Sequence, residues 1–347
     1  MRDWLLRSFV LLSTLSLSVP AALSQGFDYI GANSSSTAST IPYVSQMDNN
    51  GLGWEIVTAQ PWIPTNKTNS KELWAVFSAD QLNFSLNTLS SWHIEIWSSQ
   101  GAFVADHSQG DVLSFSSIPD LGSTTAQYGT AGGGVASYLI GFSIPETVLL
   151  PGVQYFFSIY TEYPISVAAL GVSESSIGSE TGFQHNFIPP STQYLTQTAQ
   201  IGGTSYSGTA AYKLVADEII DLGPGAGVNA GSPPVMESDF PKIGQNWTIT
   251  VTGMQPFKAG TLYFSLVPVP PLVLPFGYKF YLPFDQNLTV PLTAIYADAN
   301  GNWTGTLAIP NIPAWDGIEV YMQGVIYSPA APLFWDFTNG LKVTLRN

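Results

Sequence analysis

Cysteine is absent from this sequence of 347 residues. Disulfide bonds, thiol nucleophiles and zinc-thiolate sites are therefore excluded. A chain of this length can bury large apolar cores without such cross-links. We therefore expect its stability to come from apolar packing alone.

Charged residues are scarce, and basic ones most of all. Lys and Arg number 10 against 24 Asp and Glu, the formal net charge is −14, and only 10% of residues are charged. An acidic surface repels phosphate backbones and anionic lipid headgroups. The sequence therefore predicts no nucleic-acid partner and no binding to an anionic membrane surface.

Long apolar runs are missing except near the start. Arg2 and Arg7 precede the apolar segment "FVLLSTLSLSV", and "PAALS" follows with small residues. This pattern predicts a signal peptide over residues 1–24. The alternative is a membrane anchor, but the run is too short for a span and Pro20 ends it. We expect a secreted or extracellular protein, cell-surface location included, with no membrane insertion.

Sustained helical periodicity is also missing after the signal. β-branched and aromatic residues recur instead, with turn residues every 8–12 positions, which is typical of all-β sandwiches and barrels. We predict two antiparallel β-sandwich domains in tandem, of jelly-roll or immunoglobulin-like type, over residues 25–217 and 235–347. A Gly/Pro-rich linker or leading arm, residues 218–234, separates them.

Individual strands of the second domain show their faces. In "NWTITVTG", Trp247, Ile249 and Val251 alternate with threonines, which predicts one buried and one wet face. The dipeptide Asn300-Gly301 predicts a hairpin between the strands on either side of it.

The last long strand, in "IEVYMQGVIYSP", shows the same alternation. It predicts that Ile318, Val320 and Met322 face inward, while Glu319, Tyr321 and Gln323 face the other way. The six residues just named follow one another along this single predicted strand.

From about Leu222 to the end, several segments occur in a recognisable order. They are "LGPGAGVNAGSPPVMES", the Pro241–Gly244 step, the Ala259–Leu262 strand start, "DANGNWTGTLAIPNIPAWDGIEVYMQGVIYSP" and "TNGLKVTL". This order resembles a C-terminal β-domain that recurs in secreted bacterial proteins. The family often carries cysteines, which this chain lacks. The resemblance implies a secreted, non-enzymatic module without an assigned ligand.

The first half resembles, more loosely, the β-sandwich modules of similar secreted proteins. The similarity rests on "LLPGVQYFFSIYTE" and "TAAYKLVADE". It implies the same fold class for the first domain.

The strand "SSWHIEIWSS" places Trp92, Ile94 and Ile96 on one face and His93, Glu95 and Trp97 on the other. The second set could hold a sugar, stacked on Trp97 and hydrogen-bonded to the polar pair. The alternative is an outer sheet face covered by a loop, with Trp97 packed beneath it.

The segment "ADHSQGD" places Asp106, His107 and Asp111 in one turn. Two carboxyl groups at suitable separation can serve a glycosidase, so Glu95, Asp106 and Asp111 are the candidate catalytic residues. The alternative is a solvated hairpin turn. A serine hydrolase is disfavoured because no G-x-S-x-G occurs.

No cofactor and no metal site are predicted. The segment "DANGN" at Asp298 resembles the start of a calcium loop, but it lacks the Gly at position six and the Glu at position twelve. A structural calcium elsewhere stays open in so acidic a chain.

Three further tryptophans, Trp62, Trp315 and Trp335, lie in turn-like segments and are candidate ligand-binding residues. Indole rings stack on the C–H faces of sugars. The alternative is burial in cores, because Trp buries a large apolar area.

These observations favour a secreted, non-catalytic β-protein for extracellular binding or surface structure, with a polysaccharide or an extracellular protein as partner. Two alternatives stay open. One is a secreted glycan-active hydrolase or lyase that uses acidic residues of the first domain. The other is a subunit of an extracellular surface assembly that joins through strand edges.

Overall fold

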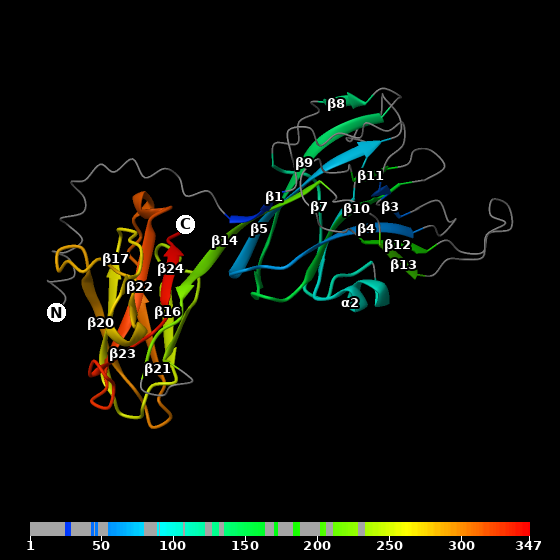
Figure 1. Ribbon diagram of the computed structural model, residues 1–347. Coiled ribbons are helices and arrows are strands. Elements are labelled where there is room, and N and C mark those ends of the chain that lie inside the picture. Colours follow the sequence, from blue (N-terminus) through cyan, green and yellow to red (C-terminus); the bar gives the residue numbers. More distant parts are fainter. Residues whose placement is uncertain are drawn as a thin grey trace, which may run out of the picture. The chain divides into compact units, whose positions relative to one another are not determined.

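The computed structural model (Figure 1) describes most of the chain. The described residues are 25–28, 43–44, 46–47, 55–79, 89, 91–106, 108–121, 127–131, 135–163, 170–172, 183–187, 202–205, 211–227 and 233–347. The expected signal peptide, residues 1–24, lies outside them. The chain divides into two compact units, which meet in sequence between Glu218 and Ile219.

The structure is mostly β, in several antiparallel sheets. Helix is limited, in the described ranges, to α2 (Gln100–Ala105) and two single 3-10 turns, η3 (Pro275–Gly277) and η4 (Pro313–Trp315). None of the helices in this part of the chain has the length and apolar character to cross a membrane.

The N-terminal unit contains two sheets. The strands of its first sheet are β1 (Gln25–Asp28), β2 (Tyr43–Val44), β5 (Lys67–Ala79), β8 (Gln127–Ala131), β9 (Val135–Leu149), β11 (Leu170–Val172) and β14 (Tyr212–Gly223). The strands of its second sheet, in chain order, are β3 (Gln46–Met47), β4 (Glu55–Trp62), β6 (Trp92–Trp97), β7 (Leu113–Ser117), β10 (Tyr155–Glu162), β12 (Phe183–Phe187) and β13 (Gly202–Ser205). In the second sheet β10, β6 and β7 are consecutive neighbours, and β7 forms one edge.

The main core of this unit draws on both sheets. Its buried residues include Leu73, Phe77, Phe142 and Tyr212 from the first sheet, and Trp92, Ile94, Ile96, Phe157 and Ile159 from the second. The predicted alternation along β6 is confirmed, because Trp92, Ile94 and Ile96 all face this core.

The opposite face of the second sheet has a smaller apolar cluster of its own. Its buried residues are Val57, Ala59, Trp97, Phe103, Phe156 and Tyr160. Phe103 comes from α2, the short helix between β6 and β7. The connection between these two strands therefore packs against the outer face of the sheet.

Strand β14 extends across the boundary in sequence. Gln25 of β1 pairs with Ala216 of β14 within the N-terminal unit, and Ile220 pairs with Lys342 within the C-terminal unit. Residues 218–223 of the expected linker therefore continue this strand as far as Gly223.

The C-terminal unit contains three sheets. Its larger sheet is formed by β17 (Ala259–Ser265), β20 (Val290–Tyr296), β22 (Glu319–Tyr327), β23 (Trp335–Phe337) and β24 (Gly340–Thr344), in the order β24-β22-β17-β20 with β23 also paired to β22. A three-stranded sheet has the order β15 (Val235–Ser238), β16 (Asn246–Thr252), β21 (Trp303–Ala308). The two short strands β18 (Leu272–Val273) and β19 (Lys279–Phe280) form a hairpin.

The core of this unit joins its two main sheets. Trp247, Ile249 and Val251 of β16 are buried there, which confirms their predicted common face. Val320 and Met322 of β22 belong to the same core, as expected.

The other face of β22 departs from a simple alternation. Tyr321 and Gln323 point away from the main core, as predicted, yet both are buried. The segment after β18 covers them, and Tyr278 and Phe280 pack there with Tyr321 in a second apolar cluster. The Gln323 side chain accepts from the Tyr281 N–H and donates to two carbonyl oxygens, so its polar atoms are satisfied inside the protein.

The predicted hairpin at Asn300-Gly301 is wrong in one respect. The turn exists, with the Gly301 N–H donating to the Asp298 carbonyl oxygen at 3.1 Å. The flanking strands β20 and β21 do not pair with each other, however, because β20 pairs with β17 and β21 with β16. A hairpin dipeptide reports the local turn alone, and here the turn connects two different sheets.

Candidate functional site

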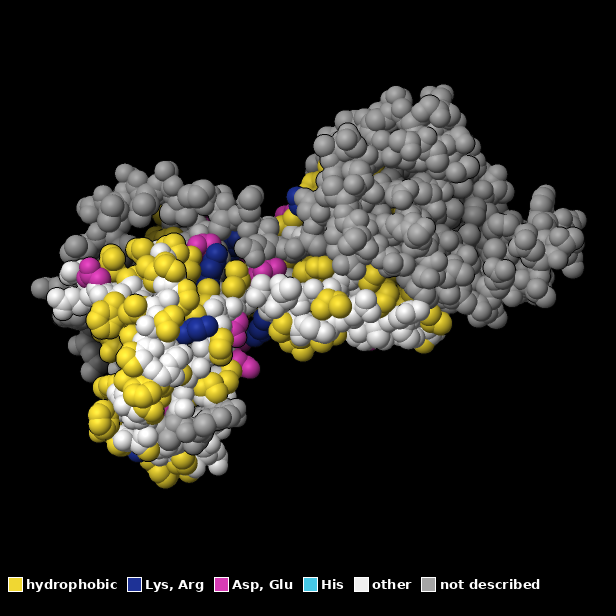
Figure 2. Space-filling model, in the orientation of Figure 1, with side chains coloured by type: hydrophobic (Ala, Val, Ile, Leu, Met, Phe, Trp, Pro, Cys, Tyr) yellow, Lys and Arg dark blue, Asp and Glu magenta, His cyan; other side chains and the backbone are white. Residues whose placement is uncertain are grey.

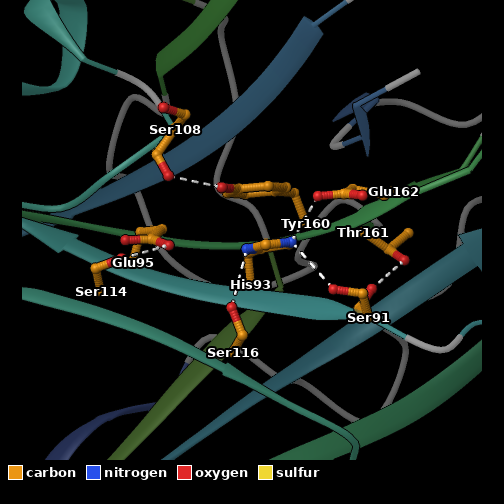
Figure 3. Close-up of polar contacts among 9 residues, drawn as sticks. All are labelled: Ser91, His93, Glu95, Ser108, Ser114, Ser116, Tyr160, Thr161 and Glu162. Atoms are coloured by element: carbon orange, nitrogen blue, oxygen red, sulfur yellow. Dashed lines mark hydrogen bonds and ion pairs between the residues drawn. The ribbon is translucent and has the colours of Figure 1, made fainter. Parts of the chain in front are cut away.

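The polar residues predicted on β6 lie on the outer face of the second sheet (Figure 3). His93 is clamped there from three sides. Its Nε2 lies 3.1 Å from the Glu162 Oε1 and 3.2 Å from the Ser91 Oγ, and its Nδ1 lies 3.1 Å from the Ser116 Oγ. The ring stacks on Tyr160 of β10, with centroids 4.7 Å apart and an interplanar angle of 4°.

Glu95 lies two residues further along β6 and is 1% exposed. Its Oε2 accepts the Gly110 N–H at 2.7 Å, and its Oε1 accepts the Ser114 hydroxyl at 3.1 Å. Burial raises the pKa of Glu95 to about 7, the two hydrogen bonds oppose this rise, and the nearby Asp106 adds to it. A carboxyl group near neutrality is suited to proton transfer, but this one is enclosed by its own loop.

Trp97 lies fully buried beneath the β6–β7 connection, so it offers no face to a ligand. Its indole N–H donates to the carbonyl oxygens of Asp106 at 2.7 Å and Gln109 at 3.1 Å. The ring of Phe103 packs edge-on against it at 4.8 Å. Trp97 therefore takes the second arrangement considered from the sequence, an indole covered by a loop.

Asp106 and Asp111 are exposed and fix the same connection. The Asp106 Oδ1 accepts the N–H and hydroxyl of Ser108. The Asp111 carboxylate accepts the N–H of Ser98 at 2.8 Å and its hydroxyl at 2.5 Å. His107, between them, lies outside the described residues.

The three candidate carboxylates thus act on one structural element, which we call the β6–β7 loop, residues 98–112. Two further contacts hold it, from the Tyr160 hydroxyl to the Ser108 carbonyl oxygen at 2.9 Å and from the Val112 N–H to Ile96. Glycosidase chemistry needs two carboxyl groups that face a substrate. Here Glu95 is buried under the loop, Asp106 forms a local turn with Ser108, and Asp111 joins the end of the loop to Ser98 at its start.

Sequence reasoning missed the pairing of Ser116 with His93. The two residues are direct cross-strand partners on β7 and β6, which no sequence spacing reveals. Ser116, His93 and Glu162 are the residue types of a hydrolytic triad, but Ser116 contacts Nδ1 and Glu162 contacts Nε2, whereas a triad has its serine on Nε2 and its acid on Nδ1. The Ser91 hydroxyl also contacts Nε2, so these contacts hold the imidazole ring in one orientation.

Two observations concern possible metal sites. Nowhere in the described part of the chain do three His, Asp or Glu side chains gather as a metal-binding group. The calcium-like segment is an Asx turn, because the Asp298 Oδ1 accepts the N–H groups of Asn300 and Asn302, both at 2.8 Å.

The remaining candidate tryptophans differ in exposure. Trp62 is half-buried against the N-terminal core, with its ring 6.1 Å from that of Phe157. Trp315 is half-buried against the C-terminal core. Trp335 is 42% exposed. Trp315 precedes β22 and Trp335 pairs with its last residue, so the two lie at opposite ends of that strand.

Trp335 belongs to a row of residues that crosses the larger C-terminal sheet. It pairs with Tyr327, and Ala259 pairs with Tyr296. Gly260 pairs with Ile326, so the next position brings Ala259 opposite Tyr327. Directly opposite residues share a sheet face. We call Trp335, Tyr327, Ala259 and Tyr296 the aromatic row.

The aromatic row lies on the solvent side of the sheet. Ile326 and Ile295, the neighbours of Tyr327 and Tyr296 in sequence, are buried in the core, so the row faces the other way. Tyr327 is 48% and Tyr296 69% exposed. Figure 2 shows hydrophobic side chains spread over the visible face of the C-terminal unit, with few charged ones among them.

Comparison with known proteins gives little more than the β architecture. No family model and no curated protein sequence matches the chain. Among solved structures, a mutant of Salmonella alpha-2-macroglobulin aligns at 9% identity and a TM-score of 0.23, over 88% of this chain and 23% of that one. The methylamine-reacted form of that protein aligns at 10% identity and a TM-score of 0.22, over 85% and 24%.

This chain spans about a quarter of the length of that macroglobulin. A similarity this weak shows no shared activity. The resemblance of residues 222–347 to a domain of secreted bacterial proteins therefore stays a prediction from sequence.

Proposed function

We propose that this protein is a secreted, non-catalytic carbohydrate-binding protein made of two β-sandwich units. One observation carries the proposal. Among the side chains whose exposure the structure describes, the large aromatic ones that are exposed lie in the C-terminal unit: Phe257, Phe276, Phe284, Tyr296, Tyr327, Phe334 and Trp335. Three of them, Tyr296, Tyr327 and Trp335, lie together in the aromatic row, and contiguous exposed apolar surface marks binding sites.

The sandwich assignment for each unit rests on the cores. In both units the main cluster of buried side chains takes members from two sheets, as in sheets that pack face to face. Secretion is supported by the N-terminal sequence pattern.

The non-catalytic part of the proposal follows from the use of the acidic residues. The carboxylates of Glu95, Asp106 and Asp111 all accept hydrogen bonds that hold the β6–β7 loop in place. No two of these three therefore form a pair that faces a substrate. The hydrolase alternative would instead need Glu95, with its pKa near 7, to reach a substrate.

The test is a binding screen of the protein from residue 25 onward against polysaccharides, with release of reducing ends measured in the same wells. Retention without release is the expected result. Release that disappears in Glu95→Gln, Asp106→Asn or Asp111→Asn would establish the hydrolase instead. Absence of retention on every polysaccharide would refute the carbohydrate proposal.

A second candidate, a subunit of a surface assembly, is favoured by strand β21. It ends the three-stranded sheet, and its sequence WTGTLA has no charge and no proline. Unprotected edges of this kind accept another strand. The edge strand β20, by contrast, contains Pro291 and a register shift, both of which disfavour pairing with a further strand.

Sedimentation of the protein at increasing concentration tests the assembly. Thr304→Lys and Thr306→Lys place charges at exposed positions on β21 and should return an oligomer to the monomer. A protein that is monomeric throughout would exclude self-assembly through this edge.

A further inference from the structure

We infer that the aromatic row is the carbohydrate site, and that it takes a short stretch of a neutral, extended polysaccharide laid across the strands. This inference rests on the proposed function and adds its location and the class of glycan. The placement, charge, rigidity and size of the row support it.

The row has the shape that a chain ligand requires. Its four residues occupy neighbouring strands, in the order Trp335, Tyr327, Ala259, Tyr296. Strands lie about 4.8 Å apart, so the row spans roughly 14 Å. The small side chain of Ala259 lies between Tyr327 and Tyr296. These two tyrosines are separated by two strand spacings, about 10 Å. Two rings at this separation can each meet a different ring of one sugar chain.

The charge of the row selects the ligand. None of its four residues is charged, while the protein as a whole has a formal charge of −14. Such a protein repels uronate- and sulfate-bearing glycans. Aromatic faces suit the C–H surfaces of neutral sugars, and the two tyrosine hydroxyl groups can donate and accept hydrogen bonds.

The row is fixed before any ligand arrives. The Ala297 N–H donates to the Lys258 carbonyl oxygen at 2.8 Å, which ties the end of β20 to the start of β17. The Ser328 N–H donates to Phe334 at 2.9 Å, which ties the end of β22 to the start of β23. The rings of Tyr327 and Trp335 contact edge to face, with centroids 5.5 Å apart. A preorganised surface loses less entropy on binding.

Two strained phenylalanines border the row. Phe257 precedes β17 by two residues and Phe334 immediately precedes Trp335. Both adopt left-handed backbone conformations, with φ of 58° and 61°, and they are 78% and 60% exposed. A non-glycine residue in this region costs free energy, and such outliers concentrate at functional sites. We call this pair the rim, and it would add apolar contact at the side of the ligand.

The size of the row argues against a protein partner. A stable protein interface takes roughly 20–30 residues from each side. The row and rim supply six in a narrow strip, which suits an oligosaccharide segment.

The experiment is affinity electrophoresis in gels that contain either a neutral polysaccharide (hydroxyethyl cellulose, xylan or galactomannan) or an anionic one (polygalacturonate or heparin). Wild type, Trp335→Ala, Tyr327→Ala, Tyr296→Ala, Trp335→Phe and Phe276→Asn are compared. Phe276→Asn is the matched control, because it removes an exposed aromatic ring of the same unit outside the row.

We expect retardation by at least one neutral polysaccharide and by neither anionic one. Loss of a central aromatic contact typically costs a factor of at least about ten in affinity. Trp335→Ala and Tyr327→Ala should therefore lose at least about tenfold, Trp335→Phe should keep most of the affinity, and Phe276→Asn all of it. Far-ultraviolet circular dichroism establishes that each variant is folded.

Each contrary result has a distinct meaning. Retardation that survives all three alanine variants overturns the site while the carbohydrate-binding function stands. Retardation by anionic polysaccharides alone overturns the neutral class. Loss of binding in Phe276→Asn but not in the row variants moves the site to the hairpin. Absence of any retardation overturns both this inference and the proposed function.

Discussion

The two units have similar cores but differ in the exposure of their aromatic side chains. Each has one main core whose buried side chains come from two sheets. In the N-terminal unit, the exposed large hydrophobic residues among the side chains with a described exposure are aliphatic: Ile63, Val104, Ile118, Val148 and Leu150. The C-terminal unit exposes seven aromatic ones. Among the side chains with a described exposure, exposed aromatic rings are thus a feature of the C-terminal unit.

The outer sheet faces show the same contrast. In the N-terminal unit the β6–β7 loop covers Glu95 and Trp97 and satisfies their polar atoms. In the C-terminal unit the segment that contains β19 covers Tyr321 and Gln323 but stops short of the aromatic row. A covered face contributes stability, whereas an open aromatic face is available to a ligand.

The largest expected effect tests this contrast with two tryptophans. Trp97→Ala should destabilise the N-terminal unit by about 3–5 kcal/mol, because it removes a fully buried ring and leaves a cavity. Trp335→Ala should change the stability of its unit by less than about 1 kcal/mol, because its ring is already partly in water. Urea unfolding followed by circular dichroism measures both. Equal destabilisation by the two substitutions would remove the contrast on which the binding surface depends.

A smaller effect is expected at Gly110, where the β6–β7 loop approaches the sheet. A Cβ there would lie 2.5 Å from the Ile96 carbonyl oxygen and 2.8 Å from the Ile96 nitrogen. Backbone atoms cannot move aside cheaply, so Gly110→Ala should cost about 2–3 kcal/mol. Gly101→Ala is the matched control, because it lies in α2 with no contact closer than 3.8 Å and should be neutral or slightly stabilising. Similar losses in both variants would mean that the loop does not depend on this close approach.

Alternation within single strands could be predicted from the sequence. The inward faces of β6, β16 and β22 are those the patterns indicate, since one buried face imposes a period of two on the side chains. Trp335 could be singled out from the sequence because it lies in a turn-like segment.

Partners across strands could not be predicted. The aromatic row joins residues 259, 296, 327 and 335, and its existence depends on which strands are neighbours and in what register. The same is true of the wrong hairpin at Asn300-Gly301 and of the Ser116–His93 contact. Local sequence specifies turns and faces, whereas sheet order is decided by packing of the whole unit.

A pH dependence is expected from Glu95. Its pKa is raised from 4.5 to about 7 in the folded protein, so the folded state binds this proton more tightly than the unfolded state does. The stability that this group contributes is fully present below about pH 4.5 and is lost as the pH rises through 7. We expect this loss to be about 1–2 kcal/mol after allowance for solvent screening.

Glu95→Gln should flatten this part of the stability profile between pH 5 and pH 8, measured by urea unfolding. Ser114→Ala removes a hydrogen bond that favours the ionised carboxylate and so raises the pKa of Glu95 further. The loss of stability with rising pH should therefore have its midpoint at a higher pH than in the wild type. An unchanged profile in Glu95→Gln would assign the pH dependence to other groups.

The smallest effect concerns the strained phenylalanines of the C-terminal unit. Phe257, Phe276 and Phe334 have φ of 58°, 63° and 61°, and all three are exposed. Asparagine tolerates this left-handed conformation better than a bulky residue does. Each Phe→Asn substitution should therefore raise the free energy of unfolding by about 0.3–1 kcal/mol, seen as a small increase in Tm. For the rim residues Phe257 and Phe334 this gain should accompany weaker glycan retention, whereas for Phe276 it should not. A stability loss at all three positions would show that the rings pack usefully where they are, and the argument that strain is retained there for binding would fail.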